Sequence, residues 1–263
     1  MISALRTPED TRWYRVAAGA LVLFAWVVLA AWGASPFAPL LSHRELAEGG
    51  LTAFRLAVFA AGWLLMTIAM MLPGSLPLVN LFRALMAGRA DRATLTPYLL
   101  LGYLSVWTAF GIAAFAGDAG LHAGVERNPA LAALDGWFGV LVLAAAGVYQ
   151  VTPLKEMCLE KCRSPYSFLV EHWRGRRARY DAVRLGMRHG LYCLGCCWTL
   201  MLVMFGIGGV NLGWMLGLGA VMLLERTSRW GRRLTAPVGL ALIVCALGLV
   251  YRVPFLVAAF GGD

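Results

Sequence analysis

The chain has 263 residues, of which 60% are hydrophobic and 14% are charged. Soluble globular domains carry about 25% charged residues, so this composition excludes a water-soluble fold and indicates a membrane protein. The net charge of +9 does not predict nucleic-acid binding, because the arginines lie between long apolar runs and form no basic stripe with interleaved aromatic residues.

Several apolar segments are long enough to cross a bilayer as helices. A crossing of the roughly 30 Å hydrocarbon core needs about 20 residues. Uncharged segments predict helical spans at 16–32, 56–72, 98–116 and 136–153, and the second span closes at Pro73-Gly74. A cleaved signal peptide is the alternative for the first span, because Arg15 precedes it and small residues lie near its end.

The next uncharged region, 189–224, is too long for a single crossing, because one helix of that length would extend about 54 Å. Its middle, 206–213, reads GIGGVNLG and is rich in turn-forming residues. The region therefore predicts two spans, 190–206 and 210–224, joined by a tight hairpin. A last span at 234–251 brings the expected number to seven.

The distribution of arginine and lysine predicts the orientation of these spans. Cytoplasmic loops carry an excess of both residues, and the excess falls at the N-terminus and after spans two, four and six. We therefore expect one membrane domain over 1–263, an all-α transmembrane bundle with a cytoplasmic N-terminus and a periplasmic C-terminus. In the large cytoplasmic loop 154–188, the segment 167–183 mixes aromatic residues with arginines, which predicts an interfacial helix.

Five of the six cysteines form two groups near the expected cytoplasmic face. They are Cys158, Cys162, Cys193, Cys196 and Cys197. Residues four apart on a helix are neighbours, so each group can present a pair of thiolates. We expect the two pairs to meet at this face and to hold one soft metal ion together. The reducing cytoplasm argues against disulfides. The sixth cysteine, Cys245, is expected to pack as a small apolar residue in the last span.

Methionine and histidine extend the candidate metal site. Met201 and Met204 continue the helical spacing of Cys193 and Cys197. Thioether beside thiolate favours Cu(I), with zinc as the alternative, although methionine stripes also arise from packing alone. His189 is a candidate nitrogen ligand, with a solvated side chain as its alternative. Three further methionines lie at the cytoplasmic end of the second span: Met66, Met70 and Met71.

Other polar residues lie near the inner ends of the spans. Glu225 closes the sixth span and is expected at the membrane interface. Tyr149, Gln150 and Thr152 lie near the inner end of the fourth span and are candidates to support the metal ligands, because polar groups within a membrane usually face protein or a cavity.

The motifs of this chain resemble a known bacterial family, the predicted metal-binding integral membrane proteins, over about residues 15–250. The resemblance rests on MTIAMMLP at 66–73, GYLSVW at 102–107, GVYQVTPLK at 147–155, CLEKCRSP at 158–165 and GLYCLGCCWTLM at 190–201. It implies a multi-pass protein of the bacterial inner membrane in which the five clustered cysteines bind the metal. Some relatives are described as membrane copper chaperones for oxidases such as tyrosinase, which implies delivery of copper to a cuproenzyme or another carrier.

The sequence therefore predicts a metal handler rather than an enzyme. Thiolates at the cytoplasmic face would capture Cu(I), and methionines of the fifth span would pass it toward the outer side. One alternative is a membrane thiol oxidoreductase with Cys193 and Cys196 as its redox pair, and another is an assembly factor with a structural zinc ion. No acid–base pair, catalytic triad or phosphate-binding loop is recognisable in the sequence.

Overall fold

The computed structural model describes residues 8–35, 52–127, 129–206 and 212–260, and every element within these ranges is a helix. The all-α class predicted from the sequence is therefore confirmed for the described part of the chain. In chain order the helices are α1 (Pro8–Gly33), α3 (Ala53–Leu85), α4 (Arg92–Arg127), α5 (Pro129–Tyr149), α6 (Pro153–Arg163), α7 (Pro165–His172), α8 (Ala178–Gly206), α9 (Leu212–Thr227) and α10 (Gly231–Phe260).

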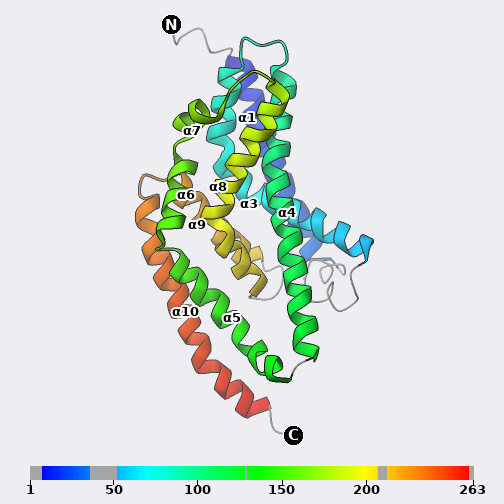
Figure 1. Ribbon diagram of the computed structural model, residues 1–263, viewed down its shortest axis with the longest axis vertical. Helices are drawn as coiled ribbons and strands as arrows, with labels where there is room; N and C mark the ends of the chain where they lie inside the picture. The colour runs from blue at the N-terminus through cyan, green and yellow to red at the C-terminus, as the bar shows by residue number, and fades with distance from the viewer. Residues whose placement is uncertain (1–7, 36–51, 128, 207–211, 261–263) are drawn as a thin grey trace.

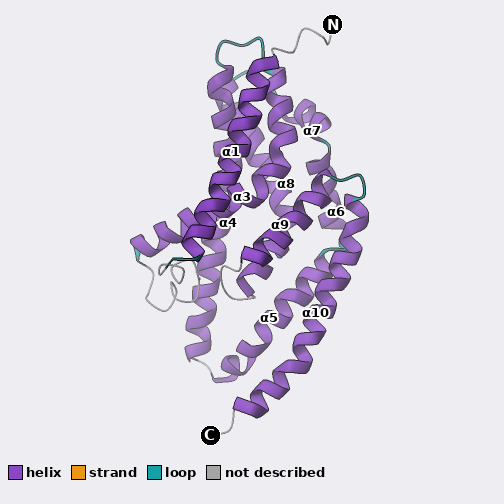
Figure 2. Ribbon diagram, turned by 180° about the vertical axis from the view of Figure 1, so that it is seen from behind, coloured by secondary structure: helices purple, strands orange, loops and turns teal. Residues whose placement is uncertain are grey.

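The helices form an elongated bundle with two distinguishable parts. At the end that carries the N-terminus, α1, α3, α4 and α8 lie side by side (Figure 1). At the other end, α5 and α10 pack against each other, as the reverse view in Figure 2 also shows. The short helices α6 and α7 connect these parts along one side of α8 (Figure 1).

Several helices are long and apolar enough to span a membrane. In the described residues four helices, α1, α3, α4 and α10, contain such a segment, and α5 with α6 adds a fifth if this bent pair forms one span. These helices indicate a multi-pass membrane protein. α9 has 16 residues, fewer than the about 20 that a crossing needs, so the seven crossings remain a prediction.

The second expected span differs from the helix that the structure contains. α3 does not end at Pro73-Gly74 but continues through a second proline to Leu85. Neighbouring side chains can satisfy the backbone groups that prolines free in membrane helices. The carbonyls that lose their helical donor are those of Ala69 and Pro73, and between them the Ser75 hydroxyl and the Arg226 guanidinium donate to the Met71 carbonyl, at 3.3 and 3.1 Å.

The segment after α6 also differs from expectation. The expected interfacial helix 167–183 is divided, because α7 ends at His172 and α8 already begins at Ala178. Between them Gly175 has a φ of 71°, a conformation that glycine adopts without the steric cost other residues incur. The predicted hairpin at 206–213 lies largely outside the described residues.

Glycines permit the close crossing of α4 and α8. A Cβ atom added at Gly102 of α4 or at Gly186 of α8 would overlap a backbone carbonyl of the other helix. Gly190 follows Gly186 at the small-xxx-small spacing that brings membrane helices close together. The crossing places Tyr103 of α4 against the following turns of α8, where the second cysteine group begins.

Candidate metal centre

A proline follows the bend between α5 and α6 and begins the second helix. Pro153 has no backbone N–H and disfavours a helical conformation in the residue before it, so α5 ends at Tyr149 and a new helix begins at Pro153. The Thr152 hydroxyl caps this helix by accepting a hydrogen bond from the Lys155 N–H at 3.3 Å. The axes of α5 and α6 differ by 64°, and the bend lays α6 against α8.

The two cysteine groups meet at this contact. Cys162 Sγ of α6 lies 4.0 Å from Cys196 Sγ of α8. Cys196 Sγ in turn lies 3.2 Å from Cys197 Sγ. All five clustered cysteines are buried free thiols, with exposed fractions of 7% or less. Thiols that are more than 30 residues apart in the sequence therefore share one buried region.

A glycine marks the closest approach of α6 to α8. A Cβ atom added at Gly195 would lie 2.5 Å from Cys158 Sγ, well inside van der Waals contact. The Tyr149 hydroxyl donates a hydrogen bond to the Gly195 carbonyl, which ties the end of α5 to the same turn of α8. The glycine within the Cys-x-x-Cys motif is thus the residue on which the first cysteine of α6 rests.

The remaining cysteine, Cys193, faces α4 and α3 through aromatic and polar neighbours. Its Sγ atom lies 3.2 Å from the Tyr103 hydroxyl, and the Tyr103 ring stacks on His189 with centroids 5.6 Å apart. His189 Nε2 lies 3.3 Å from Ser75 Oγ. The solvated position considered for His189 is wrong, because its side chain is 3% exposed; its hydrogen bond goes to a hydroxyl rather than to a thiol.

The predicted methionines lie in the same apolar cluster as the thiols. Three are buried within it and two pack against it: Met70, Met71 and Met201, then Met66 and Met204. α9 adds two buried methionines that the sequence analysis did not select, Met215 and Met222. Their spacing of seven residues places both on one face of α9, which is a signal that the sequence contains.

A buried ion pair joins the start of α6 to the end of α9. Lys155 Nζ lies 2.7 Å from Glu225 Oε2, with exposed side-chain fractions of 0% and 1%, and it also donates to the Gln150 side-chain oxygen. Glu225 is therefore buried within the protein, and its place at the membrane interface stays a prediction. Glu225 continues the buried stripe of α9 one turn past Met222, and a carboxylate can be buried there because it is paired.

A buried arginine borders the same cluster. Arg226 Nη2 donates to Ser75 Oγ at 2.9 Å, and its Nη1 donates to the Met71 carbonyl at 3.1 Å. Within the described ranges Arg226 forms no ion pair with a carboxylate. Ser75 also contacts His189, so hydrogen bonds connect Arg226 to His189 through Ser75. The positive charge of Arg226 therefore lies on the side of the core that holds Cys193.

The separation of the thiols suits a sulfur-bound ion. With metal–sulfur bonds of roughly 2.3 Å, two thiolates on a three-coordinate ion lie about 4 Å apart, and the Cys162–Cys196 separation is 4.0 Å. In the described residues no group of three or more His, Cys, Asp or Glu side chains is arranged as a complete ligand set. Binding one ion through three thiolates would therefore require side-chain rotation within the cluster.

These features define a class of protein: a multi-pass helical membrane protein with a buried, thiol-rich core. The sequence profile of the PpoB2 family, described as a copper chaperone, matches residues 60–249, which hold both cysteine groups. The chain therefore belongs to the PpoB2 copper chaperone family, and the family implies copper as the cargo and a target enzyme as the recipient. The match confirms the resemblance inferred from the motifs. No curated protein and no solved structure matches the chain significantly.

Proposed function

We propose that the protein captures Cu(I) between α6 and α8 and delivers it to a cuproenzyme or another copper carrier at the bacterial inner membrane. The observation that carries this proposal is the meeting of Cys162 and Cys196 at 4.0 Å across two helices. We further propose that Cys158, Cys193 and Cys197 complete the binding region, since they are buried around the same contact.

The proposed topology has seven crossings, with the N-terminus in the cytoplasm and the C-terminus in the periplasm. The excess of arginine at the N-terminus and after the second, fourth and sixth spans supports it. In this topology α6 and the thiols lie at the cytoplasmic face. Cysteines remain reduced on that side of the membrane, which keeps their sulfur atoms available for a metal.

The ligand types favour copper over zinc. Thiolates and thioethers select Cu(I), whereas structural zinc is held by four cysteine or histidine ligands in a closed tetrahedron. Met201 and Met204 lie one and two turns beyond Cys197 on α8, and α3 and α9 add methionines to the same cluster. We propose that these thioethers accept the ion from the thiolates by exchange of one sulfur ligand for another, with His189 as a reserve nitrogen ligand.

The burial of the cysteines favours binding over thiol exchange. A thiol oxidoreductase needs a thiolate that a partner can reach, and Cys193 and Cys196 each have an exposed fraction of 0%. A metal ion needs far less room than a partner protein. The same burial excludes water, which protects Cu(I) bound between sulfur atoms from competing ligands.

Copper titration of the full-length protein in detergent, under reducing conditions and against a chromogenic Cu(I) chelator, tests the proposal. We expect the Cys162→Ser, Cys196→Ser double variant to lose at least about tenfold in Cu(I) affinity, since even changes to outer-shell partners of metal ligands cost 10–100-fold. Cys245→Ser, which removes an exposed thiol of α10, is the matched control and should bind as the wild type does.

Two outcomes would contradict the proposal. Unchanged Cu(I) affinity in the double variant would show that the contact between α6 and α8 does not bind the ion. Tight retention of zinc together with no measurable affinity for Cu(I) would instead assign the structural-zinc alternative.

A further inference from the structure

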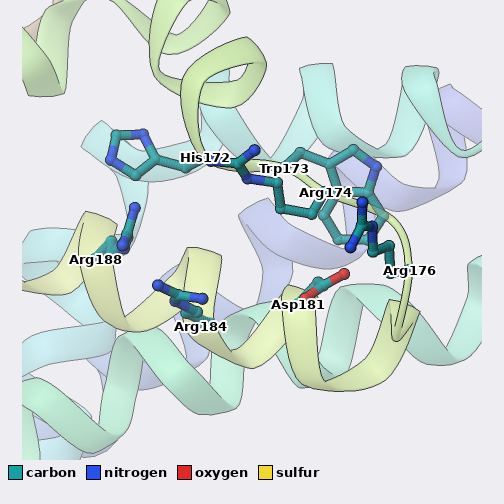
Figure 3. Close-up of a pocket in the computed structure, with 7 residues that line it drawn as sticks. All are labelled: His172, Trp173, Arg174, Arg176, Asp181, Arg184 and Arg188. Carbon is teal, nitrogen blue, oxygen red and sulfur yellow. The ribbon is translucent and has the colours of Figure 1, made fainter.

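A second polar site lies at the start of α8, on the part of the bundle where α7 joins it. A pocket of about 530 Å³ is formed by the end of α7, the segment 173–177 and the first turns of α8 (Figure 3). Arg184 and Arg188 rise from α8 toward the segment that carries Trp173 and Arg174 (Figure 3). Arg176 and Asp181 complete the charged lining.

The pocket carries an excess of positive charge. Four guanidinium groups face one carboxylate, and that carboxylate is already engaged, because Asp181 Oδ2 accepts the Arg177 backbone N–H at 3.1 Å. None of the four guanidinium groups forms a hydrogen bond or an ion pair with another described residue. Arg184 and Arg188 are also four residues apart on α8, where like charges repel each other. An anion in the pocket would relieve this repulsion.

The chemistry of the lining selects a phosphate group. Guanidinium groups present planar pairs of donors that match phosphate oxygens in bidentate geometry. Four of them around one space can bind a phosphate from several sides. A volume of about 530 Å³ lies in the range of small-molecule sites, roughly 300–1,000 Å³, so the pocket has room for a phosphate and the group esterified to it.

The surroundings of the pocket favour a lipid as the source of the phosphate. Tyr166 and Val170, one turn apart on α7, are 70% and 67% exposed, and Tyr180 of α8 is 62% exposed. Exposed apolar side chains beside arginines are typical of a helix in the membrane interface. Basic pockets beside transmembrane helices on the cytoplasmic side bind anionic headgroups.

We propose that the pocket binds the phosphate group of an anionic membrane lipid. The pocket is separate from the thiol cluster, because none of its lining residues belongs to that cluster, and its place on the cytoplasmic side rests on the proposed topology. Arg188 and Cys193 lie five residues apart on α8, so a bound headgroup would hold the thiol-bearing helix at a defined depth in the membrane.

Native mass spectrometry of the delipidated full-length protein in detergent tests this proposal. The probes are phosphatidylglycerol, phosphatidylcholine and inorganic phosphate. We expect the wild type to prefer phosphatidylglycerol, and the Arg184→Gln, Arg188→Gln variant to lose at least about tenfold in its affinity for that lipid. The matched control, Arg229→Gln with Arg233→Gln, removes the same charge from exposed arginines outside the pocket and should change the affinity less than twofold.

Each contrary result has a definite meaning. An equal loss of affinity for phosphatidylglycerol in both variants would overturn the proposed site, because it would indicate general attraction between the lipid and the basic surface. Equal binding of the two lipids by the wild type would also overturn it. Inorganic phosphate that binds as tightly as phosphatidylglycerol, and only when Arg184 and Arg188 are present, would retain a phosphate site but overturn the lipid as its source. If the first variant does not fold, Arg174→Gln with Arg176→Gln, in the segment between the helices, repeats the test.

Discussion

The two lysines of this chain lie at the two ends of α6, and each forms an ion pair of almost the same length. Lys155 Nζ lies 2.7 Å from Glu225 and Lys161 Nζ lies 2.8 Å from Glu171. The first pair is 0% and 1% exposed, and the second is 39% and 52% exposed. Solvent screens the second pair, whereas removal of one partner from the first leaves a buried charge without compensation.

This difference shows that burial rather than distance decides how much the structure depends on an ion pair. The buried face of α6 runs from Lys155 through Cys158 to Cys162. Its charged end is attached to α9 and its thiol end to α8. The buried pair therefore holds the helix that carries the first cysteine group, and the exposed pair lies outside that contact.

The largest expected effect comes from breaking the buried pair. Lys155→Met should destabilise the protein by about 3–5 kcal/mol, because Glu225 would remain buried without its counter-charge. The Lys155→Met, Glu225→Met double variant should recover most of this loss. Chemical unfolding of the full-length protein in detergent measures both. A double variant as unstable as the single variant would show that packing, rather than charge, stabilises this end of α6.

An intermediate effect is expected where α6 rests on α8 without any charge. Gly195→Ala would place a methyl group against Cys158 Sγ, and overpacking of this kind costs about 1–3 kcal/mol. Because α6 must shift, Cu(I) affinity should also fall. Gly217→Ala in α9, where a Cβ meets no atom within 4 Å, is the control. Equal unfolding and equal Cu(I) titration curves for the two variants would refute the close contact.

The smallest effect is expected at the exposed pair. The ammonium of Lys161 donates a hydrogen bond to Glu171 and lowers the pKa of that carboxyl. A depressed pKa stabilises the folded state above the unfolded pKa of glutamate, about 4.3, and this contribution is lost as the pH falls through the folded value. Lys161→Gln should therefore leave the thermal midpoint unchanged at pH 3 and nearly unchanged at pH 7. A decrease at pH 7 comparable to that of Lys155→Met would contradict the comparison.

The sequence predicts part of the candidate site, because some of the site's residues lie within one or two turns of the same helix. The spacing of Cys158 and Cys162 places both on one face of any helix that contains them, and the structure buries both. Hydropathy at the end of a span does not predict that Glu225 is buried within the protein, because its partner Lys155 lies 70 residues earlier. The apolar stripe of α9, continued past Met222, would have identified Glu225 as buried.

By itself, the sequence determined the helical membrane class and the supply of soft metal ligands, because both follow from composition and from spacings within one or two helical turns. Only the tertiary structure decided that α6 bends through 64° onto α8, which thiols of the two helices lie closest together, and that Lys155 is buried against Glu225. These contacts depend on which faces of distant helices are buried together, and no local pattern in the chain specifies that pairing.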